Sequence, residues 1–223
     1  MNFEENVIAK LKRLEREVER LKVGEKPNND GWIPVSSTWT YASATTINVP
    51  SGAAAIYKVG QGLKLKHNGA QKWFYITAVA DTQLTITGGS DYPFTSSGSN
   101  TLSEISYTNT PGTAIGFPSA FNFTPVFTSL TVTGSPIYSG KFWMSGILKF
   151  YSIQINPNGG TTASSFGSTL MNNPIAQSGF TVPVAVFYTS IAVGNFGETS
   201  TTQTYLPTWT TNSGYIFISA TYI

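Results

Sequence analysis

The chain contains no cysteine and only one histidine, His67. The lack of thiols excludes disulfide bonds, thiolate nucleophiles and cysteine-ligated zinc. One histidine among few carboxylates predicts neither a metal site nor a Ser-His-Asp triad, and the phosphate-binding loop pattern is absent. Five carboxylates follow residue 27, and none stands in a local pattern typical of glycan hydrolysis. We therefore expect a protein that is not an enzyme, with no catalytic residues, no metal and no cofactor.

Charge is also scarce, since Asp, Glu, Lys and Arg make up 11% of the 223 residues, against about a quarter in typical globular proteins. A net charge of +2 offers little attraction to nucleic acid or to anionic membranes. The first twenty residues are densely charged and lack the apolar core of a secretory signal. The longest apolar run, 182–193, contains Pro183 and is too short to span a bilayer. We expect synthesis in the cytoplasm, no nucleic-acid partner and no membrane insertion.

The few charges are concentrated at the start of the chain. Seven of the 13 basic residues and six of the 11 acidic ones precede Pro27, and all three arginines are among them. The rest is rich in Gly, Pro, Ser and Thr, a composition that favours turns and strands over helices. Two physically different parts are therefore expected to join near residues 24–31.

The first part, residues 2–23, has the pattern of a heptad repeat. Its apolar residues are spaced alternately by four and three: Val7, Leu11, Leu14, Val18 and Leu21. In this register Lys10 precedes Glu15, and Glu17 precedes Lys22, as g–e pairs of opposite sign in a parallel, in-register coiled coil. Gly24 ends the helix. The pattern predicts a coiled coil over residues 1–26.

The number of helices follows less directly from the repeat. The run KLKRLE (residues 10–15) resembles the short trimerisation motif of parallel coiled coils, with Lys10 in place of the commoner arginine. Leucine at the core positions does not itself decide between two and three helices, and the charge signs also fit an antiparallel pair. An amphipathic helix packed on its own domain is the alternative. We expect a homotrimer, most of whose association energy comes from the β-rich remainder, because about three heptads are marginal alone.

The second part, residues 31–108, alternates short apolar segments with turn signals. The expected strands are 45–49, 63–67, 72–79 and 84–87. Asn68-Gly69 lies between two of them and is a strong hairpin signal. Short strands with tight turns predict a small β-barrel.

The third part, residues 119–223, follows a linker rich in Gly and Pro. The expected strands are 126–133, 141–144, 147–155, 182–193 and 215–222, and the long polar segments 156–179 and 195–214 are expected to be exposed loops. The spacing predicts a jelly-roll-like β-sandwich. The overall fold class is thus all-β with an N-terminal helical coiled coil, assembled as a trimer.

Two of these strands carry apolar residues on both faces. In 182–193 the alternation places Val184 and Val186 on one side and Phe187 and Ile191 on the other, and 215–223 behaves similarly. A single sandwich covers one face of each sheet, so the second face is expected to meet a neighbouring subunit or another domain. The alternative is a local enrichment of partly exposed aromatic rings.

Four phrases in the first half of the chain resemble a module of minor structural proteins from tailed phages and prophages: GWIPV (31–35), WTYASATTI (39–47), KWFYITAV (72–79) and LTITGGSDY (84–92). In that family the module commonly follows a short coiled coil. The C-terminal part is similar to the trimeric sandwich domains, related to the tumour-necrosis-factor class, that end phage fibres. That similarity rests on WMSGILKFYSIQI (143–155) and ISATY (218–222), where Ala220 replaces a commoner glycine.

The resemblance implies a virion protein with a receptor-binding tip. Its N-terminal helix would attach to other virion proteins, and its C-terminal domain would face a host cell-surface glycan. A head fibre or capsid decoration protein without selective binding is the alternative, and the scarcity of acidic residues argues against a polysaccharide-degrading spike.

Stacking of aromatic rings on sugars indicates the candidate ligand-binding residues. They are Tyr205, Trp209, Trp143 and Tyr138, which lie in or beside polar segments. The alternative is that these rings fill the sandwich core or a subunit interface.

Overall fold

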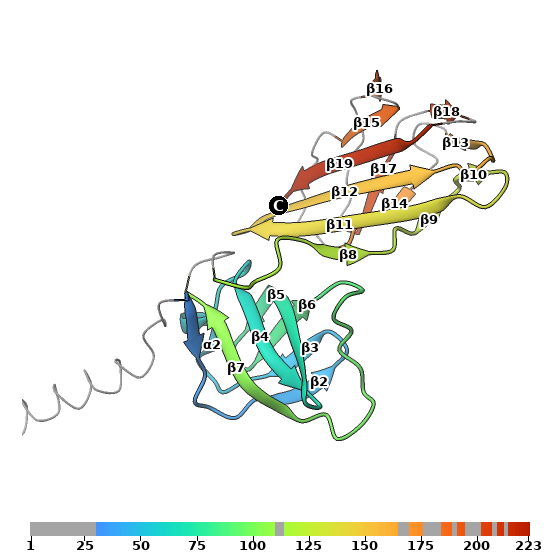
Figure 1. The fold of residues 1–223 in the computed structure, drawn as a ribbon. Helices are drawn as coiled ribbons and strands as arrows, with labels where there is room; N and C mark the ends of the chain where they lie inside the picture. Colours follow the sequence, from blue (N-terminus) through green and yellow to red (C-terminus); the bar gives the residue numbers. More distant parts are fainter. Residues whose placement is uncertain are drawn as a thin grey trace, which may run out of the picture.

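The computed structural model describes residues 30–109, 114–164, 170–175, 184–188, 191–194, 202–206, 209–211 and 214–223. The predicted coiled coil over residues 1–26 lies outside them. The described chain is predominantly β-structure, and every strand pair in it is antiparallel (Figure 1). The predicted all-β class is therefore confirmed for the part of the chain that the structure describes.

Residues 30–109 form one seven-stranded sheet, which we call the N-terminal module. Its strand order is β1 (Trp32–Pro34), β7 (Leu102–Thr108), β4 (Gly62–His67), β5 (Ala70–Ala80), β6 (Gln83–Thr87), β3 (Thr46–Asn48) and β2 (Thr40–Ser43), with the short helix α2 (Ala53–Ile56) between β3 and β4. The expected hairpin at Asn68-Gly69 is confirmed, because both residues have positive φ, 50° and 82°, as a type I′ turn requires.

The long strand β5 explains how this sheet encloses a core. Its first half pairs with β4 and its second half with β6, and the register shifts by one residue between Ile76 and Ala78. Such a bulge bends the strand and increases its twist. The curved sheet surrounds fully buried apolar side chains, among them Ile47, Leu63, Leu65 and Leu84.

The described residues from 114 onward form the C-terminal module. Its largest sheet has the order β16 (Ile191–Gly194), β15 (Val184–Tyr188), β19 (Ile216–Tyr222), β12 (Leu148–Asn156), β11 (Ile137–Ser145) and β8 (Phe121–Phe123). Two three-stranded sheets complete the described strands. One contains β10 (Thr131–Val132), β13 (Thr162–Ser164) and β18 (Trp209–Thr211), and the other β17 (Gln203–Tyr205), β14 (Leu170–Asn172) and β9 (Phe127–Thr128).

The large sheet and the small sheets share one hydrophobic core. The large sheet contributes the inward side chains of β11, β12 and β19, such as Phe142, Ile153 and Ile218. Met171 on β14 and Trp209 on β18 complete the core from the other side. Figure 1 shows β19, β12 and β11 in front of β17 and β14, so the module has two layers.

Two expected strands are each divided in the structure. The segment 126–133 is interrupted at Ser129, whose φ of 61° ends β9, and β10 then joins a different sheet. The segment 182–193 contains two strands, β15 and β16, which pair antiparallel, so the chain reverses between them. A continuous apolar run did not reveal the reversal, because both strands of this hairpin are apolar throughout.

The segments 156–179 and 195–214 are not simply loops. They contribute β13, β14, β17 and β18, which form most of the second layer. These strands are three residues long and mainly polar, and their buried residues include Thr162, Met171, Thr204 and Trp209. The expectation of exposed loops was wrong because so few inward positions leave no visible alternation.

The two modules are in direct contact through an aromatic junction. The ring of Tyr75 on β5 belongs to the core of the C-terminal module and lies 5.0 Å from Phe117 and 5.1 Å from Phe121, centroid to centroid. The backbones of Gly60 and Gly146 also meet, since a Cβ built on Gly60 would lie 2.0 Å from the Gly146 carbonyl oxygen. In Figure 1 β8 is the strand of the large sheet nearest the N-terminal module.

Candidate functional site

The residues predicted to assemble the protein are outside the described part of the chain. They are Val7, Leu11, Leu14, Val18, Leu21, Lys10 and Glu15. Their role in a coiled coil stays a prediction.

The four candidate ligand-binding rings do not form one site. Trp143 lies on the side of β11 that faces away from the core, whereas Tyr138 on the same strand packs inward, 5.3 Å from the Phe127 ring. Tyr205 is half-buried on β17, in the second layer. Trp209 is a core residue with 3% of its surface exposed.

The position of Trp209 corrects the prediction that it stacks on a sugar. Stacking requires an open ring face, and the packed core around Trp209 provides none. Its alternating polar neighbours made the segment look exposed, but β18 pairs with β13 and turns the indole inward. The alternative considered for these rings, that they fill the sandwich core, applies to Trp209.

The side of the large sheet that faces away from the core, which we call the outer face, carries aromatic pairs. Trp143 and Phe150 are cross-strand partners whose rings stack at 5.4 Å with an interplanar angle of 3°. Tyr215 and Phe217 are 45% and 40% exposed, with ring centroids 6.2 Å apart. Phe150 was not singled out from the sequence, although the turn at Gly146 places it opposite Trp143.

One lysine of this sheet points into the core instead of into solvent. Lys149 is 7% exposed, and its ammonium lies 5.7 Å from the centroid of the Tyr222 ring. Burial lowers the pKa of Lys149 from its ordinary value. The ring offers the ammonium a cation–π contact, which offsets part of the cost of its desolvation.

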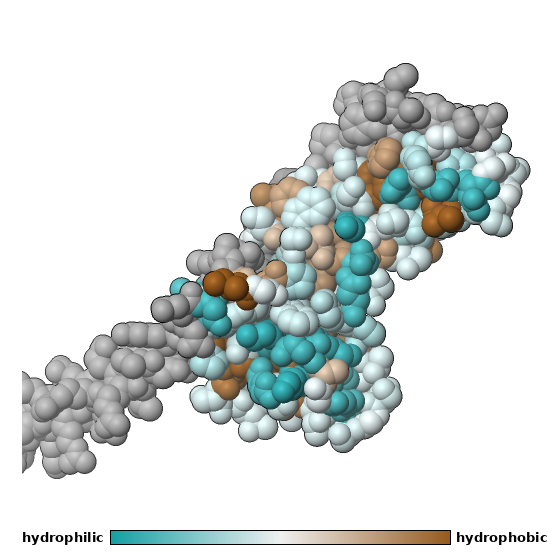
Figure 2. All heavy atoms as spheres, in the orientation of Figure 1, coloured by the Kyte–Doolittle hydropathy of each residue, from teal (hydrophilic) through white to brown (hydrophobic). Residues whose placement is uncertain are grey.

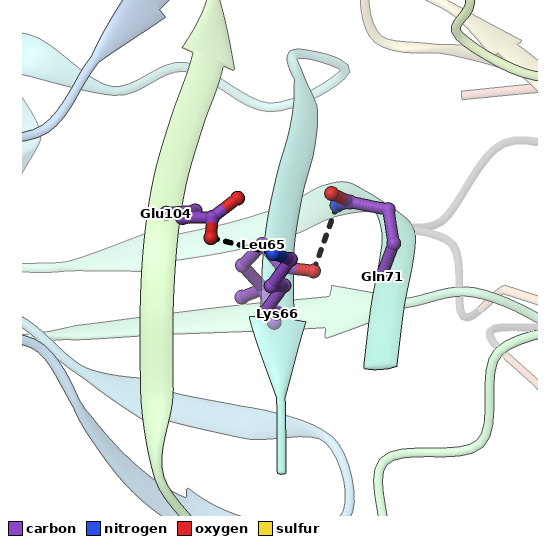
Figure 3. Close-up of polar contacts among 4 residues, drawn as sticks. All are labelled: Leu65, Lys66, Gln71 and Glu104. Carbon is purple, nitrogen blue, oxygen red and sulfur yellow. Dashed lines mark hydrogen bonds and ion pairs between the residues drawn. The ribbon is translucent and has the colours of Figure 1, made fainter. Parts of the chain in front are cut away.

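A groove of about 470 Å³ crosses the N-terminal module beside β7. Glu104 lines it at a bulge, where two residues of β7 lie opposite one residue of β4, and Glu104 has a φ of 49°. The Glu104 carboxylate lies 2.5 Å from Lys66 Nζ, and Gln71 Nε2 donates to the Leu65 carbonyl at 2.9 Å. Figure 3 shows both contacts. Lys64 also lines the groove, with its ammonium 4.5 Å from the centroid of the Trp32 ring, so the groove presents polar surface with charges of both signs.

A second hollow, of about 450 Å³, is lined by aromatic residues that include Tyr41, Phe74 and Phe94. His67 packs beside it, 5.7 Å from the parallel ring of Tyr41 and 4.4 Å from Phe94. His67 is 2% exposed, and its Nε2 atom has no hydrogen-bond partner among the residues that the structure describes. Burial, followed by the nearby Lys72 ammonium, lowers the pKa of His67 from its ordinary value, while the Asn100 side chain opposes the shift.

The described carboxylates take part in local hydrogen bonds. Asp81 accepts from the Ser51 hydroxyl at 2.6 Å and from the Gly52 amide at 2.8 Å, and these bonds lower its pKa. Asp91 accepts two bonds from Asn122 across the junction, and Asp30 accepts from the Trp32 amide. Glu198 lies outside the described ranges.

Two features are absent from the residues that the structure describes. No three histidine or carboxylate side chains in these ranges are grouped so that they could hold a metal ion. Of the helices that the structure describes, none is both long and apolar enough to cross a membrane.

Comparison with protein-family models, with curated proteins and with solved structures found no significant match. The arrangement of the modules and their surfaces is therefore the basis for the function proposed next.

Proposed function

We propose that this protein is a non-enzymatic structural protein of a phage particle, a homotrimeric fibre. Its N-terminal coiled coil sets the trimer and attaches it to other virion proteins. In this proposal the seven-stranded sheet takes the place of the expected small barrel, although its end strands β1 and β2 do not pair with each other. The two-layered module takes the place of the jelly-roll-like sandwich and points outward toward a host cell-surface glycan.

The observation that carries this proposal is the aromatic junction between the modules. Tyr75 of the N-terminal module packs with Phe117 and Phe121 in the core of the C-terminal module, which is separate from the core of the N-terminal module itself. Asn122 donates two hydrogen bonds to Asp91 between the modules, at 2.7 and 2.9 Å. Flexible linkers are the usual connection between independent domains. A fibre instead has to hold its tip in a fixed direction from its attachment point, and a shared aromatic core supplies that stiffness.

Two buried tyrosine hydroxyls support a structural role more than a catalytic one. The buried hydroxyl of Tyr151 pairs with Thr204 at 3.0 Å, and that of Tyr222 donates to the Ile175 carbonyl at 2.9 Å. Both bonds tie the large sheet to other segments of the C-terminal module, so these hydroxyls hold the two layers together.

Labelling on intact particles tests the location. Gold-labelled antibody against the full chain should decorate a projection of the particle in electron micrographs, with copies present in multiples of three. Label confined to the head surface would favour the head-fibre or decoration role. Absence of the protein from purified particles would contradict the proposal.

A glycan array probed with the full chain tests whether the C-terminal module binds a host glycan. The full chain is needed because separating the modules would expose Phe121, which packs on Tyr75. We expect selective binding that Tyr205→Ala abolishes and Tyr205→Phe retains, since phenylalanine keeps the stacking ring. Unselective binding by the unaltered chain would remove the receptor-binding role and leave pure decoration.

A further inference from the structure

The outer face of the large sheet lacks the polarity expected of a solvated surface. An antiparallel sheet with one face on a core normally places polar residues on its other face. Here the outward positions of β11, β12 and β19, together with the adjoining Tyr215, include six large apolar or aromatic side chains: Ile137, Trp143, Leu148, Phe150, Tyr215 and Phe217. Ile137 is 57% exposed and Leu148 39%. Apolar residues gathered in this way mark an interaction surface more often than scattered ones do.

The same face is almost free of charge. Lys141 is the one charged residue among the outward positions of these three strands, while Lys149 is turned into the core. The N-terminal module provides an internal comparison, because its strands carry the half-buried Lys64 and Lys66 and the exposed Glu104. Figure 2 shows mostly pale and brown atoms over β19, β12 and β11, and broad teal areas on the N-terminal module. Depletion of charge combined with enrichment of aromatic residues is typical of the centre of a protein interface.

We propose that the outer face, centred on the Trp143–Phe150 and Tyr215–Phe217 pairs, packs against a second copy of this chain. This inference rests on the proposed trimer and names the surface through which its C-terminal modules meet. The heptad repeat favours a second copy over an unrelated partner, because a parallel coiled coil would hold identical modules at a high effective concentration. The junction adds to this, since modules that are rigidly joined cannot rotate independently out of contact.

The small residues between the aromatic pairs suit a close approach of two sheets. Ser152 on β12 lies between Lys141 and Ser219 in the register of the sheet, midway between the two aromatic pairs. Serine hydroxyls can exchange hydrogen bonds with a facing copy without the desolvation cost of a charge. The assignment also removes Trp143 from the ligand-binding candidates and leaves Tyr205 as the first of them.

The lack of cysteine permits a direct test on the full chain. Ser152→Cys places a single thiol in the middle of the outer face, and Ser103→Cys places one on an exposed position of β7 as a matched control. Sedimentation gives the assembly state of each variant, and the rate of reaction with a maleimide gives the accessibility of its thiol. In the trimer we expect Ser152→Cys to react at least about tenfold more slowly than Ser103→Cys, because reaction then requires the interface to open.

Adding Leu14→Asp to disrupt the predicted coiled coil should raise the maleimide reactivity of the thiol in Ser152→Cys to the level of the Ser103→Cys control. Equal reactivity of the two thiols in a trimeric chain would overturn the assignment of the face and leave the trimer standing. A monomer at micromolar concentration would contradict the proposed function itself. If the thiol at position 152 stays protected in a monomer that carries Leu14→Asp, another segment of the same chain covers the outer face, and the proposal is overturned. If the thiol is protected only in whole particles, another virion protein covers the face, which also overturns the proposal.

Discussion

At the scale of single residues, Gly60 marks a close approach between the modules. A Cβ there would lie 2.0 Å from the carbonyl oxygen of Gly146, and the φ of Gly60 is 88°. Gly60→Ala should therefore incur both backbone strain, about 1–2 kcal/mol, and a steric cost of about 3 kcal/mol. Urea unfolding of the full chain would measure the loss.

Gly52 is the matched control for this substitution. Its φ is 92°, and no atom lies within 4 Å of a Cβ built on it. Gly52→Ala should therefore show the backbone strain alone. If both variants lose the same stability, the contact between Gly60 and Gly146 contributes nothing, and the rigid junction loses one of its supports.

His67 should make the stability of the protein depend on pH in a window where carboxylates do not titrate. Its pKa is lowered in the folded state, so the unfolded chain, with an ordinary pKa of 6.5, binds the proton more readily. Stability should therefore be greatest above pH 6.5 and fall as the pH drops below 6.5 toward the lowered pKa. The charged group that faces the imidazole is Lys72, which opposes protonation, and the Tyr41 and Phe94 rings on its faces offer no carboxylate.

Thermal melts between pH 7.5 and pH 5 would measure this effect. The variant His67→Phe keeps an aromatic ring between Tyr41 and Phe94 but cannot be protonated. In this variant the slope of melting temperature against pH in this range should vanish. A slope that persists unchanged in this variant would show that another group is responsible.

At the scale of the element, the bulge in β7 stores strain at Glu104. A non-glycine residue at a φ of 49° costs about 1 kcal/mol relative to glycine. The ion pair with Lys66 is largely exposed, with Glu104 63% accessible, and such pairs contribute little. Glu104→Gly should therefore be more stable than Glu104→Ala by about 1 kcal/mol. Both variants lose the carboxylate, so equal stabilities in chemical denaturation would exclude strain as the cause.

Local signals in the sequence predicted some elements well. Asn68-Gly69 and the turn at Gly146 each determine a hairpin within a few residues, and β4, β5, β11 and β12 follow from them. The second layer was missed because its three-residue strands depend on pairing with distant segments, as Met171 does with Phe127. Register across such distances is set by the assembled core and not by local pattern.

The candidate site shows the same division between local and distant information. That Trp143 stands opposite Phe150 follows from a two-residue turn, but the burial of Trp209 depends on its pairing with β13, some 45 residues earlier in the chain. The junction was missed for the same reason. Phe117 was assigned to the linker and Phe121 to the start of the third part, and only the folded chain brings Tyr75 into contact with both.

At the scale of the whole molecule, the heptad repeat, the rigid junction and the outer face depend on one another. In the proposed trimer, the junction allows the predicted coiled coil to orient both modules, and oriented modules can bring their outer faces together. Each contact alone would be weak, but contacts linked through one chain reinforce one another because the second forms at a high effective concentration. Disrupting the predicted coiled coil should therefore weaken assembly by more than the lost leucine contacts alone would contribute, because the outer-face contact is weakened as well.

Leu14→Asp tests this dependence. It places one carboxylate per chain at a core position of the repeat, where burial of unpaired like charges is strongly unfavourable. Ala9→Asp introduces the same charge on the opposite, outward side of the helix and is the matched control. Sedimentation equilibrium should show the dissociation constant of Leu14→Asp raised by at least about a hundredfold and that of Ala9→Asp within about threefold of the unaltered chain. If Leu14→Asp remains fully assembled, the outer face alone holds the copies together, and the coiled coil serves only for attachment.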